Sequence, residues 1–165
     1  MPFSRSRRLV VLAAIGVLSL GMIAPSMAAY AAEDSGLQDR VDAVLAEFPG
    51  GTQTKANEIS WDGGQMILTL ATGDDSFAAR AVGSCATGYY CAYSGYNLSG
   101  SKLSFSACNT TQSTSALSVV RSIANARSSG SVQGKNSSGS VLATIGANGS
   151  LGYAPVNITR LTCIS

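Results

Sequence analysis

The stretch SCATGYYCAYSGYNLSG, residues 84–100, decides the fold of this chain of 165 residues. Two cysteines and four tyrosines lie among Gly, Ser and Asn residues, and short apolar or aromatic strings alternate with turn-forming pairs. This composition is typical of a compact all-β domain with many turns. Because the same composition continues to the C-terminus, we expect one such domain over residues 81–165.

Six strands are expected in this domain from their apolar and aromatic content. They are Tyr89 to Tyr93, Lys102 to Ser106, Val119 to Ala124, Ser131 to Gly134, Val141 to Ile145 and Val156 to Thr162. The order strand, polar turn with Gly, strand, gap, strand occurs twice, since residues 94–103 are echoed by 134–142 and residues 120–123 by 158–161. Two such units packed face to face would form a small sandwich with one shared core.

All four cysteines, Cys85, Cys91, Cys108 and Cys163, lie in this domain. An even number of cysteines in a small exported domain indicates disulfides, whereas a metal site would need closer Cys/His spacing and the chain has no His. Four cysteines allow three connectivities, among which the sequence does not choose. We favour Cys85 with Cys91 and Cys108 with Cys163. The longer bridge should then stabilise more, by about 4 kcal/mol on the entropic account.

From Ser76 to Ser165 the chain contains no Asp, Glu or His. Those side chains carry most proton transfer near neutral pH, and carboxylates supply most ligands for calcium. A serine nucleophile would also need a base within hydrogen-bond reach, and this segment offers only Lys or Tyr. We therefore expect a binding protein that is not an enzyme, with no catalytic residues, no cofactor and no metal site.

The N-terminus is typical of a secretory signal peptide over residues 1–31. Arg5, Arg7 and Arg8 precede an apolar run from Leu9 to Ala24, and Ala29 to Ala31 offer a cleavage site. The run is short for a bilayer span of about 20 residues, so we expect cleavage and no membrane anchor. The general secretory route is favoured over a twin-arginine route, and both export the chain. The expected location is extracellular.

Residues 32–80 form an acidic leader, with nine acids from Ala32 to Asp75 against Arg40 and Lys55, whereas residues from Ser76 onward carry a charge of +6. A helix is expected from a capping box at Ser35 to Phe48, followed by a hairpin of Glu58 to Trp61 and Gln65 to Leu70. A linker is expected over 71–82. The leader is either a solvated segment, attracted to the domain at low salt, or a pro-segment that covers its basic face. Its small size predicts docking on the domain or partial order.

The spacing Tyr93, four residues, Leu98, one residue, Gly100 resembles the βγ-crystallin Greek-key signature, which has a second aromatic where Leu98 stands. Together with residues 84–95 and Arg121 to Asn125, it is similar to the actinobacterial secreted metalloproteinase-inhibitor family. The resemblance covers Gly83 to Cys163 and implies a βγ-crystallin-like sandwich of two Greek keys, with Tyr93, Leu98, Gly100, Arg121 and Ser122 as fold-signature residues. It also implies peptidase inhibition with an extracellular protease as partner.

The known inhibitor of that family presents a disulfide-clamped loop to a zinc protease, and this chain has no cysteine between Cys108 and Cys163 to form the clamp. The candidate contact loop is residues 145–155, with Asn148, Leu151 and Tyr153 as contact residues; the alternative is a plain turn. Calcium sites of crystallins need acids or Asn just ahead of the strand through Arg121. Leu117 and Ser118 stand there, so no calcium site is expected.

Nucleic acid and cell-surface polymers are the alternatives to a protease as partner. The six cations after Ser76 are scattered singly and the tyrosines are explained by core packing, so no nucleic acid is expected. A second hypothesis is a structural or cell-surface protein, possibly antimicrobial in role, that binds glycan or anionic cell-wall polymer through its cationic surface.

Overall fold

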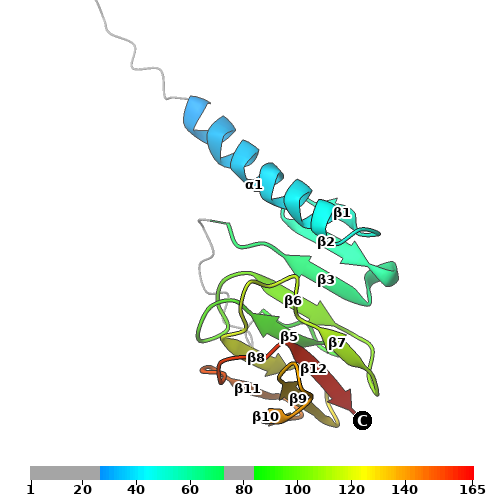
Figure 1. Ribbon diagram of the computed structural model, residues 1–165. Coiled ribbons are helices and arrows are strands. Elements are labelled where there is room, and N and C mark those ends of the chain that lie inside the picture. The colour runs from blue at the N-terminus through cyan, green and yellow to red at the C-terminus, as the bar shows by residue number, and fades with distance from the viewer. Residues whose placement is uncertain (1–26, 73–83) are drawn as a thin grey trace, which may run out of the picture.

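The computed structural model describes residues 27–72 and 84–165 (Figure 1). Most of the predicted signal peptide and the predicted linker from residue 73 onward lie outside the described residues. Within the described residues, no helix is both long enough and apolar enough to cross a bilayer.

The leader consists of one helix and a small sheet. Helix α1 spans Met27–Glu47, and the strands are β1 Thr52–Lys55, β2 Glu58–Trp61 and β3 Met66–Thr69, with a 3-10 turn at Asp62–Gly64. The predicted hairpin is confirmed, and its register pairs Ile59 with Leu68 and Trp61 with Met66. The predicted helix is confirmed but begins earlier than Ser35, because the Ala-rich residues before it also favour helix.

The C-terminal domain is built from short strands. They are β5 Tyr90–Tyr93, β6 Lys102–Phe105, β7 Thr111–Ser113, β8 Ser122–Asn125, β9 Ser131–Lys135, β10 Val141–Gly146, β11 Gly149–Leu151 and β12 Arg160–Ile164. The six predicted strands are present. Two start later than predicted, at Ser122 and Arg160. Val120 and Ile158 are buried apolar residues that lie in the loops before these strands, and their apolar character extended the predicted strands too far.

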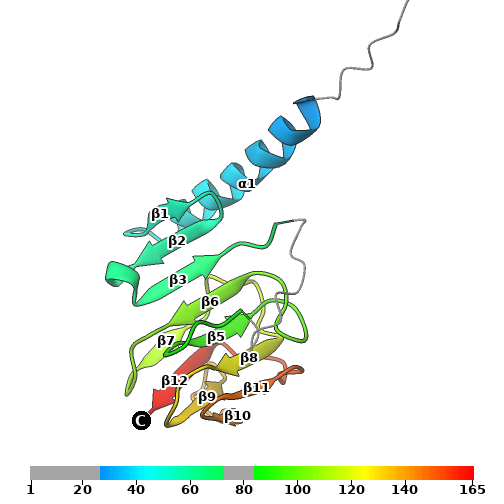
Figure 2. The ribbon, with the colours of Figure 1, turned by 180° about the vertical axis from the view of Figure 1, so that it is seen from behind.

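The strands form two antiparallel sheets (Figures 1 and 2). One has the order β1-β2-β3-β6-β5-β8-β11, and the other has the order β10-β9-β12-β7. In the first half of the domain, β5, β6 and β8 share one sheet while β7 joins the other. The second half mirrors this arrangement, with β9, β10 and β12 in the four-stranded sheet and β11 in the seven-stranded one. Each half therefore contributes one strand to the sheet that is formed mainly by the other half.

A single row of apolar side chains crosses the inner face of the seven-stranded sheet. The pairing registers align one residue from each of six adjacent strands: Ile59, Leu68, Leu103, Ala92, Ile123 and Leu151. On the domain side this row packs in one core with Val132, Ile145 and Leu161 of the other sheet. On the leader side the same core contains Val41 of α1. Of the two alternatives, docking or partial order, residues 37–70 of the leader show docking, and one core serves both parts.

The outer face of the same sheet holds a second, smaller cluster. Side chains alternate along β5, so Tyr90 and Ala92 join the main core while Cys91 and Tyr93 join the outer cluster. Leu98 and Cys85 pack against these outer residues. All four residues of β5 are buried for this reason.

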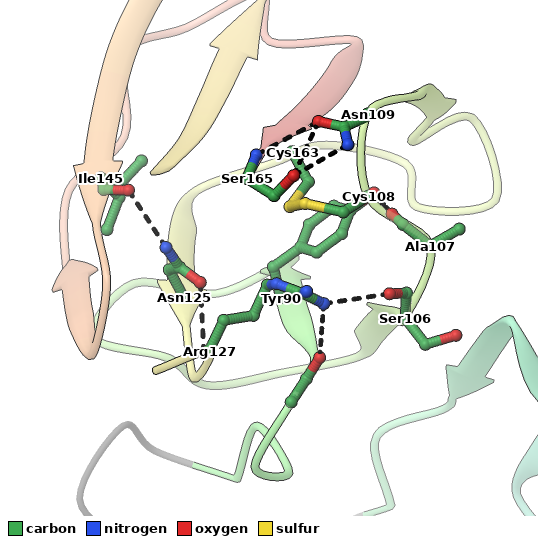
Figure 3. The surroundings of a disulfide bond; sticks show 11 residues. Tyr90, Ser106, Ala107, Cys108, Asn109, Asn125, Arg127, Ile145, Cys163 and Ser165 are labelled. Carbon is green, nitrogen blue, oxygen red and sulfur yellow. Dashed lines mark hydrogen bonds between the residues drawn. A yellow bond between two sulfur atoms is a disulfide. The ribbon is translucent and has the colours of Figure 1, made fainter. Parts of the chain in front are cut away.

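The buried Tyr90 predicts a loss of stability at alkaline pH. Its ring stacks on Phe105 with 5.3 Å between centroids, and its hydroxyl donates a hydrogen bond to the Ala107 carbonyl at 2.9 Å (Figure 3). Burial raises the pKa of Tyr90 from 10.0 to about 12. Tyr90 loses its proton at lower pH in the unfolded chain than in the folded protein. The free energy of unfolding is therefore unaffected below pH 10 and falls by about 2–3 kcal/mol as the pH rises through 12. Urea unfolding between pH 9 and 12 measures this fall, which should be shallower in Tyr90→Phe.

Candidate protein-binding surface

The predicted contact loop, residues 145–155, contains a tight turn that joins β10 of one sheet to β11 of the other. Asn148 lies in the turn between β10 and β11 with a φ of 53°, and its amide donates to the Arg127 carbonyl at 3.0 Å. Leu151 lies in β11, pairs with Ile123 and packs against the main core, so its expected exposure is wrong. Its position follows from strand exchange, because β11 is the edge strand that the second half lends to the other sheet. Asn148 and Tyr153 are both exposed, and the Tyr153 side chain is 67% exposed.

Tyr153 belongs to an exposed aromatic group that we call the tyrosine face, made of Tyr96, Arg121 and Tyr153. The two rings stack with 5.1 Å between centroids at an interplanar angle of 30°. The Arg121 guanidinium lies over the Tyr96 ring, 5.1 Å from its centroid. These three residues come from three loops or strand ends of the domain, before β6, before β8 and after β11. Sequence reasoning explained most of the tyrosines by core packing, which holds for Tyr90 and Tyr93 but is wrong for Tyr96, whereas Tyr153 was predicted as a contact residue.

The backbone beneath the tyrosine face is held by hydrogen bonds between its segments. The Asn97 amide donates to the Gly152 carbonyl at 2.9 Å, and the Ala154 amide donates to the Arg121 carbonyl at 2.8 Å. The Arg121 amide in turn donates to the Tyr93 carbonyl in β5 at 2.8 Å. The side chains are therefore presented from a fixed frame. A partner that binds here loses little conformational entropy in ordering this surface.

The segment that carries Tyr96 is a folded hairpin pinned by Ser122. The Ser122 hydroxyl accepts a hydrogen bond from the Leu98 amide at 2.9 Å and donates one to the Gly95 carbonyl at 2.6 Å. Leu98 has a φ of 62°, and its side chain packs on the outer cluster with Tyr93. Gly100 has a φ of 76°, and an added Cβ would lie 2.6 Å from the Ser94 hydroxyl. Of the predicted signature residues, Leu98 and Gly100 lie in this turn and Ser122 binds it from β8, with Leu98 where the resemblance expects an aromatic.

Replacing Ser122 should destabilise this turn. In Ser122→Ala the Leu98 amide and the Gly95 carbonyl both lose a buried partner, so we expect a loss of about 1–3 kcal/mol in the free energy of unfolding. Urea denaturation monitored by circular dichroism measures it. Ser99→Ala is the matched control, because the Ser99 hydroxyl makes one exposed bond to the Tyr96 carbonyl. An equal loss in both variants would show that Ser122 does not pin the hairpin.

A shallow hollow of about 470 Å³ lies in the C-terminal domain and is lined by both hydroxyl-bearing and aliphatic side chains. Its lining includes Ser113, Ser115, Ser118, Ser137 and Thr159, with Arg160 as its charged side chain. Leu117 also lines it, next to Ser118, and these are the two residues that the crystallin resemblance placed where a calcium ligand would be expected. Across the described residues, no three His, Cys, Asp or Glu side chains gather as a metal-binding group. The hollow presents hydroxyl donors and acceptors but no carboxylate.

The tyrosine face has the chemistry of a binding surface. Tyr and Arg are enriched among the residues that dominate protein interfaces, because they combine a large apolar area with hydrogen-bonding groups. On this face the Tyr153 hydroxyl accepts from the Asn97 side-chain amide at 3.4 Å, and Val156 on the same loop is 77% exposed. A partner that binds this face can cover the rings of Tyr96 and Tyr153 and can pair an acceptor group with the Arg121 guanidinium.

Comparison with known proteins gives one match. Residues 78–144 match the model of peptidase inhibitor family I36, a stretch of less than half of the chain. No curated protein and no solved structure matches the chain. The matched stretch contains Tyr96 and Arg121 of the tyrosine face and ends before Tyr153.

Proposed function

We propose that the chain is an exported peptidase inhibitor that binds its target through the tyrosine face. The observation that carries the proposal is the match of residues 78–144 to a peptidase inhibitor family. The geometry contributes the binding surface, since two residues of this stretch, Tyr96 and Arg121, form an exposed face with Tyr153. We further propose that the sandwich is of the βγ-crystallin type found in the actinobacterial metalloproteinase inhibitors. The exchange of one strand between the two halves supports that assignment.

The proposed mode of binding differs from a disulfide-clamped loop. The structure joins Cys85 to Cys91 and Cys108 to Cys163, the pairs favoured from the sequence. The short loop of the first bridge excludes the tyrosine face, and the second bridge spans 55 residues and does not clamp a single short loop. Stiffness comes instead from the main-chain bonds at Asn97 and Ala154. Two disulfides also support export, because such bonds persist in oxidising compartments.

Titration of the secreted protein into peptidase assays tests the proposal. A zinc metallopeptidase is the first target, with one serine and one cysteine peptidase run in parallel. We expect saturable inhibition of at least one of them at a ratio of one inhibitor to one enzyme. Protein that has been reduced and alkylated is the control and should be inactive. Absence of inhibition of all three classes at micromolar concentration, with both disulfides intact, would contradict the proposal.

A further inference from the structure

The leader and the domain meet along one strand edge, where β3 pairs with β6. The register runs from Met66 opposite Phe105 to Thr69 opposite Lys102. Hydrogen bonds continue past both ends of the strands. The Ser106 amide donates to the Gln65 carbonyl at 3.0 Å, and the Ala71 amide donates to the Ser101 hydroxyl at 3.0 Å. We call this contact, from residues 65–71 to residues 101–106, the seam.

The seam is apolar on the inner face of the sheet. Leu68 and Leu103 face each other across it, and both side chains are fully buried. Cross-strand apolar pairs of this kind are the unit that stabilises a sheet. Val41 and Trp61 in the leader belong to the same core as Phe105 in the domain. Separation would therefore open a core that is continuous across the seam.

Charge contributes one attraction across the seam, between Glu58 in β2 and Lys102 in β6, which do not form a salt bridge. Within the described residues the one salt bridge joins Lys55 to Glu58, and both lie in the leader. Lys102 stands at the end of the seam, but its ammonium donates to the Ser84 carbonyl at 2.9 Å. The opposite charges of the leader and the domain left two alternatives, a solvated leader or a pro-segment that covers the basic face. The structure instead joins the two parts by a strand edge and by apolar side chains, which salt does not screen.

Separated from each other, the leader and the C-terminal domain would each expose an unpaired strand edge. The leader described here, residues 27–72, is smaller than domains that usually fold without help, and its strand β3 would expose an unpaired edge. The domain would expose the edge of β6 with Leu103 beneath it. Leu37, Val41, Val44 and Leu45 of the helix pack in the core, and removal of a signal peptide at residues 29–31 leaves them in place.

We propose that residues 36–72 remain bound to the C-terminal domain in the mature protein and are not a pro-segment that dissociates after cleavage. The acceptor surface is the edge of β6, residues 101–106, and its partner is the β3 strand of the same chain. A cut anywhere in residues 73–83 removes a covalent connection and none of the seam contacts described above. The protein then persists as a one-to-one complex of two pieces, whether or not it inhibits a peptidase.

The test uses the full-length secreted protein with a site-specific protease sequence inserted between Ser76 and Phe77. The folded protein is cut and then applied to size exclusion with light scattering, in low salt and in 1 M salt, where the Debye length is about 3 Å. We expect one species with the mass of the two pieces added together at both salt concentrations. Separate elution of the pieces at either concentration overturns the proposal. A species of twice that mass also overturns it, because the leader would then be exchanged between copies.

Two variants locate the contact at the seam. Ser101→Ala removes the acceptor of the Ala71 amide and should raise the dissociation constant of the cut pieces about five-fold. Leu68→Ala removes a buried side chain of β3 and should raise it at least about thirty-fold. Ser99→Ala is the control and should leave the constant unchanged, because its hydroxyl bonds within the domain. An unchanged constant in both seam variants would overturn the proposal.

Discussion

Removing the Cys108–Cys163 bridge should lower the free energy of unfolding by about 4 kcal/mol, because this bridge closes a loop of 55 residues in the unfolded chain. It joins the segment after β6 to the last strand, and so ties the first half of the domain to the end of the second (Figure 3). The double variant Cys108→Ala/Cys163→Ala tests this in urea denaturation. A loss of this size is a large fraction of the stability of an ordinary domain.

The Cys85–Cys91 bridge is the matched control. It spans six residues, and the same entropic account gives about 2 kcal/mol for its removal in Cys85→Ala/Cys91→Ala. The surroundings of the longer bridge also support the larger effect. The Asn109 amide donates to the Cys163 carbonyl at 2.9 Å, and the Asn109 side chain accepts from the Ser165 amide at 3.2 Å. Equal losses in the two double variants would contradict the entropic account.

Truncation of Tyr153 should weaken inhibition about thirty-fold or more, which corresponds to about 2 kcal/mol of binding free energy. Its ring is largely exposed and stacks on Tyr96, so removing it deletes half of the aromatic surface without opening the core. The inhibition constant of Tyr153→Ala against the most sensitive peptidase measures the effect. Tyr153→Phe keeps the stacked ring and loses the hydroxyl contact to Asn97, so it should weaken inhibition less than about ten-fold.

The control for Tyr153→Ala is Val141→Ala. Val141 is 49% exposed, lies in β10 and is not part of the tyrosine face. We expect an inhibition constant within about two-fold of the starting value, as for most surface residues outside an interface centre. A large effect at Val141 together with a small effect at Tyr153 would move the binding surface to the four-stranded sheet.

The sequence predicted those elements of the fold whose signal is local. The hairpin of β2 and β3 follows from apolar strings around Asp62, Gly63 and Gly64, and the strands β5 and β6 from aromatic and apolar content. Three strands were missed, namely β1, β7 and β11. They have three or four residues each and mostly polar or small side chains, so nothing in their composition separates them from turns. Their existence depends on a neighbouring strand that the tertiary fold supplies.

The candidate surface shows the same limit. Tyr153 and Arg121 were singled out from the sequence, one as a contact residue and one as a signature residue. Tyr96 was assigned to the core, because spacing along one strand does not reveal which face a loop residue takes. The stacking of Tyr96 on Tyr153 joins residues 57 positions apart in the chain and requires the pairing of β11 with β8. The seam between β3 and β6 was not predictable for the same reason.

The central claim is that a peptidase binds at the tyrosine face. Hydrogen exchange of the inhibitor, alone and in complex with the peptidase that it inhibits best, tests this claim directly. The account predicts slower exchange of the amides at residues 95–98, 152–154 and 156, with unchanged exchange at the seam and at the Asn148 turn. Protection confined to the Asn148 turn, to β10 or to the leader would contradict it.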